Sequence, residues 1–325
     1  MKLSKYVNCK KSTLALLMAA MSMQPMFSGA AFGYGDTMNA NSHTAFTHTN
    51  LDAKPVAANP AWSGLIGEYG PDDAILIVFE QEGSLYGTLA GAASQQFIEQ
   101  ADGSFIFAEQ SASFALSPSG RATGFMWNGN STARRNIEPE VGQSFKVHPE
   151  SSISTLRDVA IGATAPAEEG DFVASDLYDV TRVSKTIKLD IRYAGHNNFL
   201  GEPVYADAKA FLQRPAAMAL GRAHEALAKH GYGLLIHDAY RPWYVTKIFW
   251  DATPESGKVF VANPADGSRH NRGAAVDLTL YDLKTGSPVK MVGTYDEMSA
   301  RSYPGYRGGT SLERWHRDLL RHAME

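Results

Sequence analysis

A histidine and an aspartate that could bind a metal lie seven positions apart, at His270 and Asp277 (277 − 270), in the second half of the chain. Gly273 lies between them and permits a tight backbone turn. The residues after it, up to Leu280, are mainly apolar or β-branched and predict a buried strand. We therefore expect His270 on a loop and Asp277 on the strand that follows. Imidazole nitrogen and carboxylate oxygen both bind zinc, and a catalytic zinc needs a third protein ligand and one open position for water.

The same pair also has a plainer interpretation, because a histidine and an aspartate with this spacing occur in surface loops that bind no metal. The surrounding residues favour the metal site. The stretch SRHNRGAAVD, residues 268–277, resembles the signature of the VanX-like D-alanyl-D-alanine dipeptidases. It more broadly resembles that of LAS-type zinc peptidases, which cut peptidoglycan peptides. The resemblance extends from about Asp190 to the C-terminus.

A second stretch, Asp238-Ala-Tyr-Arg-Pro242, also matches the family. The preceding residues Gly233–Ile236 are apolar and predict a buried strand with this stretch at its end. Arg241 precedes a proline, which keeps its backbone extended. An arginine at a rigid strand end can hold an oxyanion or a carboxylate through two parallel hydrogen bonds. The alternative is a surface ion pair between Arg241 and Asp238.

Two further residues fall where the family contacts its substrate. The resemblance implies that Asp296 pairs with the ammonium of a dipeptide, which would explain a preference for free dipeptides over internal peptide bonds. It also implies that Ser268 lines the substrate. Asp296 could instead be a solvated turn carboxylate, and Ser268 an ordinary loop hydroxyl.

The resemblance implies one zinc ion per chain, with His270 and Asp277 as ligands, and Arg241 as the residue that stabilises the tetrahedral intermediate. In the family, a later strand with the motif Glu-Trp-Trp-His supplies the general base and the third zinc ligand. This sequence stops at Glu325, before any such strand. We therefore expect either a truncated product of a dipeptidase gene or a degenerate homologue, with weakened zinc binding and a slower reaction.

Glu313 and His316 reproduce a Glu-x-x-His spacing within the last predicted helix, residues 311–325. On a helix they could share a face. Thr310 and Glu313, however, form a capping-box pattern, which explains the glutamate without catalysis. We therefore do not expect Glu313 and His316 to replace the missing pair.

The elements that position these residues predict an α+β domain over residues 174–325, with a central antiparallel sheet. Residues 187–193 alternate as a strand does. Residues 215–229 have helical periodicity, and Gly231 provides a C-terminal cap. The strand at 233–236 and the helix at 311–325 complete the expected framework.

The first half of the chain has a different pattern. Short apolar runs separated by turn residues over 59–147 predict a small all-β barrel or sandwich module. Residues 148–173 have the Pro, Gly, Ser and Ala content of a linker. Residues 32–58 have no period and predict a disordered segment. The aromatic residues of the β-module are expected in its core.

Residues 1–31 predict a secretory signal peptide, with a basic start, an apolar run and small residues at a cleavage region. Cys9 is the single cysteine and lies within this segment, so no intrachain disulfide is possible. We expect export, to a periplasm, with no membrane span in the mature protein; an uncleaved N-terminal anchor is the alternative. The net charge of −4 gives no electrostatic basis for nucleic-acid binding.

The predicted function is zinc-dependent hydrolysis of D-alanyl-D-alanine in cell-wall turnover, by a hydrolase of the metallo-dipeptidase class. One alternative is a D,D-carboxypeptidase that acts on peptidoglycan stems. The other is a non-catalytic cell-wall binder that keeps the fold without the metal. The pattern leaves the oligomeric state and the role of the β-module open.

Overall fold

The computed structural model describes residue 51 and residues 53–89, 92–136, 144–167 and 170–325. The predicted signal peptide and nearly all of the segment expected to be disordered lie outside the described residues. The described residues, from 51 to 325, belong to one compact unit. In the described part of the chain, no helix is both long and apolar enough to span a membrane.

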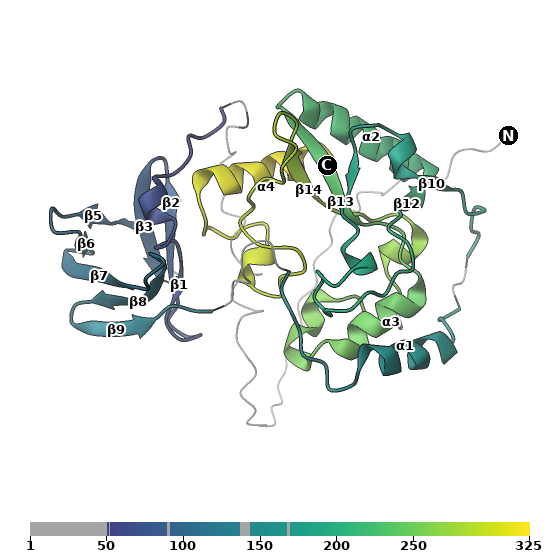
Figure 1. Ribbon diagram of the computed structural model, residues 1–325, viewed down its shortest axis with the longest axis horizontal. Coiled ribbons are helices and arrows are strands. Elements are labelled where there is room, and N and C mark those ends of the chain that lie inside the picture. Colours follow the sequence, from purple (N-terminus) through teal and green to yellow (C-terminus); the bar gives the residue numbers. More distant parts are fainter. Residues whose placement is uncertain (1–50, 52, 90–91, 137–143, 168–169) are drawn as a thin grey trace, which may run out of the picture. The chain divides into compact units, whose positions relative to one another are not determined.

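The N-terminal half is built from two antiparallel sheets (Figure 1). The strands of the first are β1 Gly67–Tyr69, β2 Leu76–Gln81, β3 Ser84–Leu89 and β4 Gln95–Gln96. Those of the second are β5 Ile98–Glu99, β6 Phe105–Phe107, β7 Gln110–Leu116, β8 Ala122–Trp127 and β9 Asn130–Ala133. Neither described sheet closes on itself, so a barrel is not confirmed.

The two sheets share one aromatic core. Phe97 stacks on Phe107 with ring centroids 4.3 Å apart, and Phe125 and Tyr69 pack into the same buried cluster. Aromatic pairs at this distance add to the free energy gained by burying apolar surface. These aromatic side chains therefore form the core, as the sequence predicted.

The segment predicted as a linker contains a helix, α1 Ile153–Gly162. The Ser152 side chain accepts a hydrogen bond from Thr155 N and so begins the helix as an N-cap. Helix α1 packs against α3 Trp243–Ala252 (Figure 1), and Ala160 is fully buried. Small and polar residues gave 148–173 the composition of a linker, so this helix was missed.

The C-terminal half combines helices with a central three-stranded sheet in the order β11-β13-β14. Its strands are β11 Lys188–Leu189, β13 Tyr232–Asp238 and β14 Asp277–Asp282. Strand β14 runs antiparallel to β13, but β11 runs parallel to it. The predicted central antiparallel sheet is therefore confirmed for β13 and β14 and wrong for β11, because alternation alone does not specify strand direction.

Other elements flank this sheet. They are α2 Arg214–Ala228, α4 Ser311–Met324 and the antiparallel pair β10 Leu177–Asp179 with β12 Phe211–Gln213. Short 3₁₀ turns are η1 Pro60–Trp62, η2 Val180–Arg182, η3 Arg192–Ala194, η4 Glu255–Phe260, η5 Arg269–Arg272 and η6 Ala300–Ser302. The stretch predicted as one strand at 187–193 is thus the short β11 followed by η3.

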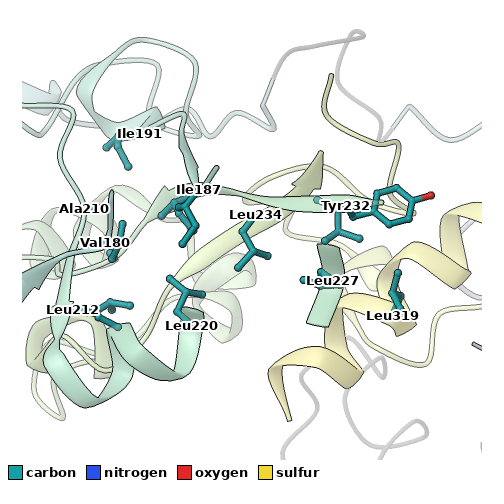
Figure 2. Close-up of a cluster of buried hydrophobic side chains, with 14 of the residues drawn as sticks. Val180, Ile187, Ile191, Ala210, Leu212, Leu220, Leu227, Tyr232, Leu234 and Leu319 are labelled. Carbon is teal, nitrogen blue, oxygen red and sulfur yellow. The ribbon is translucent and has the colours of Figure 1, made fainter. Parts of the chain in front are cut away.

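Strand β13 is buried along its whole length, which explains its apolar sequence. Leu234 of this strand, Leu220 and Leu227 of α2 and Leu319 of α4 lie in one cluster (Figure 2). Burying one such leucine stabilises the fold by about 1.5–3 kcal/mol. This packing fixes the position of Asp238, the last residue of β13, and of Arg241, three residues later.

Helix α4 receives a cap from the N-terminal sheets. The buried Glu80 carboxylate of β2 accepts hydrogen bonds from Ser311 N at 2.7 Å and from Gly83 N at 2.7 Å. Thr310 and Glu313 form the predicted capping box at the same helix end. A carboxylate at this end also interacts favourably with the helix dipole.

We expect Glu80→Gln to lower the free energy of unfolding by about 1–3 kcal/mol, because one oxygen acceptor becomes an amide donor that faces an N–H group. Urea unfolding measures this change. Glu82→Gln is the matched control, because Glu82 is exposed, and it should change stability by less than about 0.5 kcal/mol. Equal losses in the two variants would contradict the cap.

Candidate metal and substrate site

The loop with His270 is a short 3₁₀ turn, η5, that begins at a capping box. The Ser268 side chain accepts from His270 N, and the Asn271 side chain accepts from Ser268 N. Gly273 ends the turn with a φ of 64°, the left-handed conformation that favours glycine. Asp277 is the first residue of β14. The predicted loop, turn and strand are therefore confirmed.

His270 and Asp277 face each other. His270 Nε2 lies 3.3 Å from Asp277 Oδ1. On the other side of the ring, Nδ1 lies 2.8 Å from the carbonyl oxygen of Ala239, which can only accept. A proton therefore belongs on Nδ1, which leaves Nε2 as the nitrogen that faces Asp277. Nε2 can donate a proton to this carboxylate, or bind a metal once that proton is released, and the Ala239 carbonyl fixes the orientation of the ring in both cases.

Arg241 points at the same carboxylate. Its Nη2 atom lies 3.4 Å from Asp277 Oδ2. Burial raises the pKa of Asp277, but the hydrogen bond with His270 and the charges of His270 and Arg241 outweigh it, so the net pKa is lowered. The imidazole, the carboxylate and the guanidinium thus converge on one place, as predicted.

The Arg241–Asp238 ion pair also exists, but it is buried and not on the surface. Arg241 Nε and Nη2 lie 2.9 Å and 2.8 Å from Asp238 Oδ2. The residues are 8% and 1% exposed. Arg241 N also donates to His270 O at 3.0 Å, which ties the arginine to the metal-binding loop. The pair therefore supports the site.

Asp238, His270 and Asp277 form a group whose ligand atoms lie within 4.8 Å of one another. The oxygens of Asp238 are already used: Oδ2 accepts from Arg241, and Oδ1 accepts from Ala239 N and Tyr205 OH, each at 2.8 Å. A carboxylate with these partners has little capacity left for a metal. Among the described residues, His270 Nε2 and Asp277 are therefore the two groups that fit a metal ion.

Asp296 lies in the same region, with a φ of 58° that few non-glycine residues adopt. Its Oδ2 accepts a hydrogen bond from Tyr193 OH at 2.8 Å. Burial, followed by the negative charge of Asp277, raises the pKa of Asp296 to about 8. A cationic group beside it would restore its negative charge.

The remaining predicted residues have structural partners. Ser268 caps η5, as described above. Glu313 caps α4 and accepts from Lys290 Nζ at 2.7 Å. Both ring nitrogens of His316 are engaged, with Tyr232 OH at 2.9 Å and Lys290 O at 3.2 Å. Glu313 and His316 are not part of the metal-binding group.

Three tyrosines around the site were not predicted. Tyr193 OH bonds to Asp296, Tyr205 OH bonds to Asp238, and Tyr295 OH lies 3.5 Å from Asp277 Oδ2. Tyr295 could have been found from its position next to Asp296. Tyr205 carries no local signal, because its partner is 33 positions away.

Comparisons with known proteins agree with this geometry. Residues 173–325 match a family model described as D-ala-D-ala dipeptidase. The D-alanyl-D-alanine dipeptidase of Escherichia coli (strain K12) is 33% identical over 129 residues, which are 40% of this chain and 65% of that protein. That of Enterococcus faecalis is 35% identical over 160 residues, 43% of this chain and 78% of that protein. That of Streptomyces coelicolor is 34% identical over 170 residues, 47% of this chain and 84% of that protein. The chain thus spans just under two thirds of the first of these relatives and about four fifths of the others.

Proposed function

Because the chain belongs to the D-alanyl-D-alanine dipeptidase family, we propose that it hydrolyses D-alanyl-D-alanine to D-alanine in the turnover of cell-wall peptides. The matches confirm the family that the sequence predicted. The observation that carries the proposal is the convergence of His270 Nε2 and Arg241 Nη2 on the carboxylate of Asp277.

Zinc is the metal that fits this proposal. His270 through Nε2 and Asp277 through a carboxylate oxygen would hold it, since one nitrogen and one oxygen ligand suit zinc. When bound, the ion polarises the scissile carbonyl and makes water more acidic. The sequence contains no Glu-Trp-Trp-His motif. Within residues 1–325 we therefore assign two zinc ligands and no general base.

Arg241 would stabilise the negative charge that develops on the carbonyl oxygen. Its Nε and Nη2 atoms are held by Asp238, and no described residue accepts from Nη1. A guanidinium already fixed in this way loses little entropy when it donates to an oxyanion. Its buried position also strengthens the interaction, because little water competes.

Asp296 would bind the free amine of the dipeptide. Its hydrogen bond from Tyr193 and its electrostatic interaction with Asp277 support this role. The ammonium group of a free dipeptide would be the cationic partner of this carboxylate and would keep it ionised. An N-acylated substrate has no such charge and would leave Asp296 without its partner.

We expect the full chain with one equivalent of zinc to release D-alanine from D-alanyl-D-alanine but not from an N-acylated D-alanyl-D-alanine tripeptide. We also expect Asp296→Asn to raise KM for the free dipeptide by about 10- to 100-fold, the effect of losing one hydrogen bond to a charged group. Enzymatic quantification of D-alanine measures both. Activity on the acylated tripeptide alone would support the carboxypeptidase alternative. Stoichiometric zinc that survives dialysis would count against the non-catalytic binder.

We also propose export of the protein, on the pattern of residues 1–31 described above. Fusion of these residues to a reporter that is active only outside the cytoplasm tests this proposal.

A further inference from the structure

Beside the candidate site lies a polar group that the proposed reaction does not use. It consists of Asp190, Arg192, His237 and Tyr295, and we refer to it as the Tyr295 cluster. Asp190 Oδ2 lies 2.7 Å from Arg192 Nε and 3.4 Å from His237 Nδ1. His237 is 4% exposed and lies at an irregularity in the β13–β14 pairing, between Ile236 and Asp238.

The orientation of the His237 ring is fixed by two acceptors. Its Nδ1 atom lies 3.1 Å from the carbonyl oxygen of Asp190 and 3.4 Å from the Asp190 carboxylate. Neither acceptor can donate, so the proton belongs on Nδ1. The hydrogen bond from His237, despite burial, lowers the pKa of Asp190 to about 2, so the carboxylate stays charged at neutral pH.

The side chains of Arg192 and His237 both contact the Tyr295 ring. The His237 ring centroid lies 4.7 Å from that of Tyr295. The Arg192 guanidinium lies 5.8 Å from the same ring centroid, a distance at which a cation interacts with an aromatic ring. Asp190 therefore positions Arg192 and His237, and both of these side chains contact the ring of Tyr295.

The next residue along the chain is Asp296. Its φ of 58° is strained for an aspartate and persists only where the surroundings impose it. Tyr193 contributes one contact, through its hydroxyl. Glu297 closes the turn around Asp296, because its N donates to Thr294 O at 3.3 Å and its carboxylate accepts from Thr294 N at 2.9 Å. The ring of Tyr295, one residue before Asp296, is a further support.

We propose that Tyr295 and His237 are positioning residues for amine recognition: they fix the backbone at 295–296, so that the Asp296 carboxylate is directed at the ammonium of a free dipeptide. This inference rests on the proposed function, because it assumes that Asp296 binds the amine. It assigns the effect to the Tyr295 ring and not to its hydroxyl, because the ring makes the contacts with His237 and Arg192.

Isothermal titration calorimetry of the purified full chain without added zinc, so that the dipeptide is not hydrolysed, tests the inference with D-alanyl-D-alanine and with N-acetyl-D-alanyl-D-alanine. The readout is the ratio of the two Kd values. Tyr295→Leu, which removes the ring, should weaken binding of the free dipeptide by about 10-fold and leave the acetylated one unchanged. Tyr295→Phe keeps the ring and should retain the wild-type ratio.

His237→Ala removes the same ring contact by deleting the imidazole, and it should shift the ratio of the two Kd values in the same direction. The inference therefore stays testable if Tyr295→Leu does not fold. Asp207→Asn is the control, because Asp207 is an exposed carboxylate paired with Lys209. A wild-type ratio in Tyr295→Leu and His237→Ala, or equal weakening of both ligands, would overturn the inference. A wild-type protein without preference for the free amine would instead overturn the role of Asp296 in the proposed function, and this inference with it.

Discussion

Asp238→Asn is expected to lower the free energy of unfolding by about 3–5 kcal/mol, the loss typical of removing one partner of a buried ion pair. Arg241 Nε donates a hydrogen bond to Asp238 Oδ2, Nη2 forms an ion pair with the same oxygen, and both residues are almost completely buried. Asparagine keeps the shape but removes the charge, so the guanidinium would remain buried without its main counter-ion. Denaturant unfolding of wild type and variant measures the difference.

The chain contains a matched control. Arg214 contacts Asp176 in a similar two-bond arrangement, at 2.6 Å and 3.0 Å, but both side chains are about half exposed. Solvent screens such a pair, so Asp176→Asn should cost less than about 1 kcal/mol. Similar losses of unfolding free energy in the two variants would show that burial does not distinguish these ion pairs. That result would contradict the role of Asp238 in supporting Arg241.

The second large effect is expected at His270. Replacing it with alanine removes the one nitrogen ligand that the described residues offer to a metal in this group. We expect wild-type protein to bind zinc and His270→Ala to bind it at least about 100-fold more weakly. Loss of a residue that only hydrogen-bonds to a metal ligand already lowers metal affinity by about 10- to 100-fold, and loss of the ligand itself should lower it at least as much. Competition with a chromophoric chelator measures both affinities.

His196→Ala is the control for the zinc measurement, because His196 is a surface histidine with a 73% exposed side chain. It should leave zinc affinity unchanged. Equal zinc binding by wild type and His270→Ala would remove His270 from the site, and with it the metal-based reaction.

The residues of the site were predictable because their signals are local. Gly273 ends the turn after His270 with a positive φ, and the apolar run after it forms β14, so loop and strand followed from adjacent residues. Arg241 was predictable from the proline after it, and the capping box at Thr310 and Glu313 from its spacing. Each of these features depends on chemistry within a few positions.

The features that the sequence did not predict depend on distant contacts. Tyr205 and Asp190 act through residues more than thirty positions away. The parallel direction of β11 depends on its pairing with β13, more than forty residues later in the chain. The periodicity of apolar residues does not specify such a pairing. The helix within 148–173 is stabilised by packing against α3, and its own composition is that of a linker.

Other predictions from the sequence stay predictions. The domain boundaries at residues 59, 148 and 174 have not been tested. The roles of Asp296, Ser268 and Arg241 in catalysis and binding also await the variants described above. The contact of Arg241 with Asp277 is consistent with the family to which the chain belongs.

Diffraction from zinc-soaked crystals, measured on both sides of the zinc absorption edge, tests the central proposition most directly. We expect one strong anomalous peak at about 2.0–2.1 Å from His270 Nε2 and about 2.0–2.2 Å from an oxygen of Asp277. Arg241 should remain bound to Asp238. A peak at other residues only, with His270 Nε2 still bound to the Asp277 carboxylate, would contradict the metal site on which the proposed reaction depends.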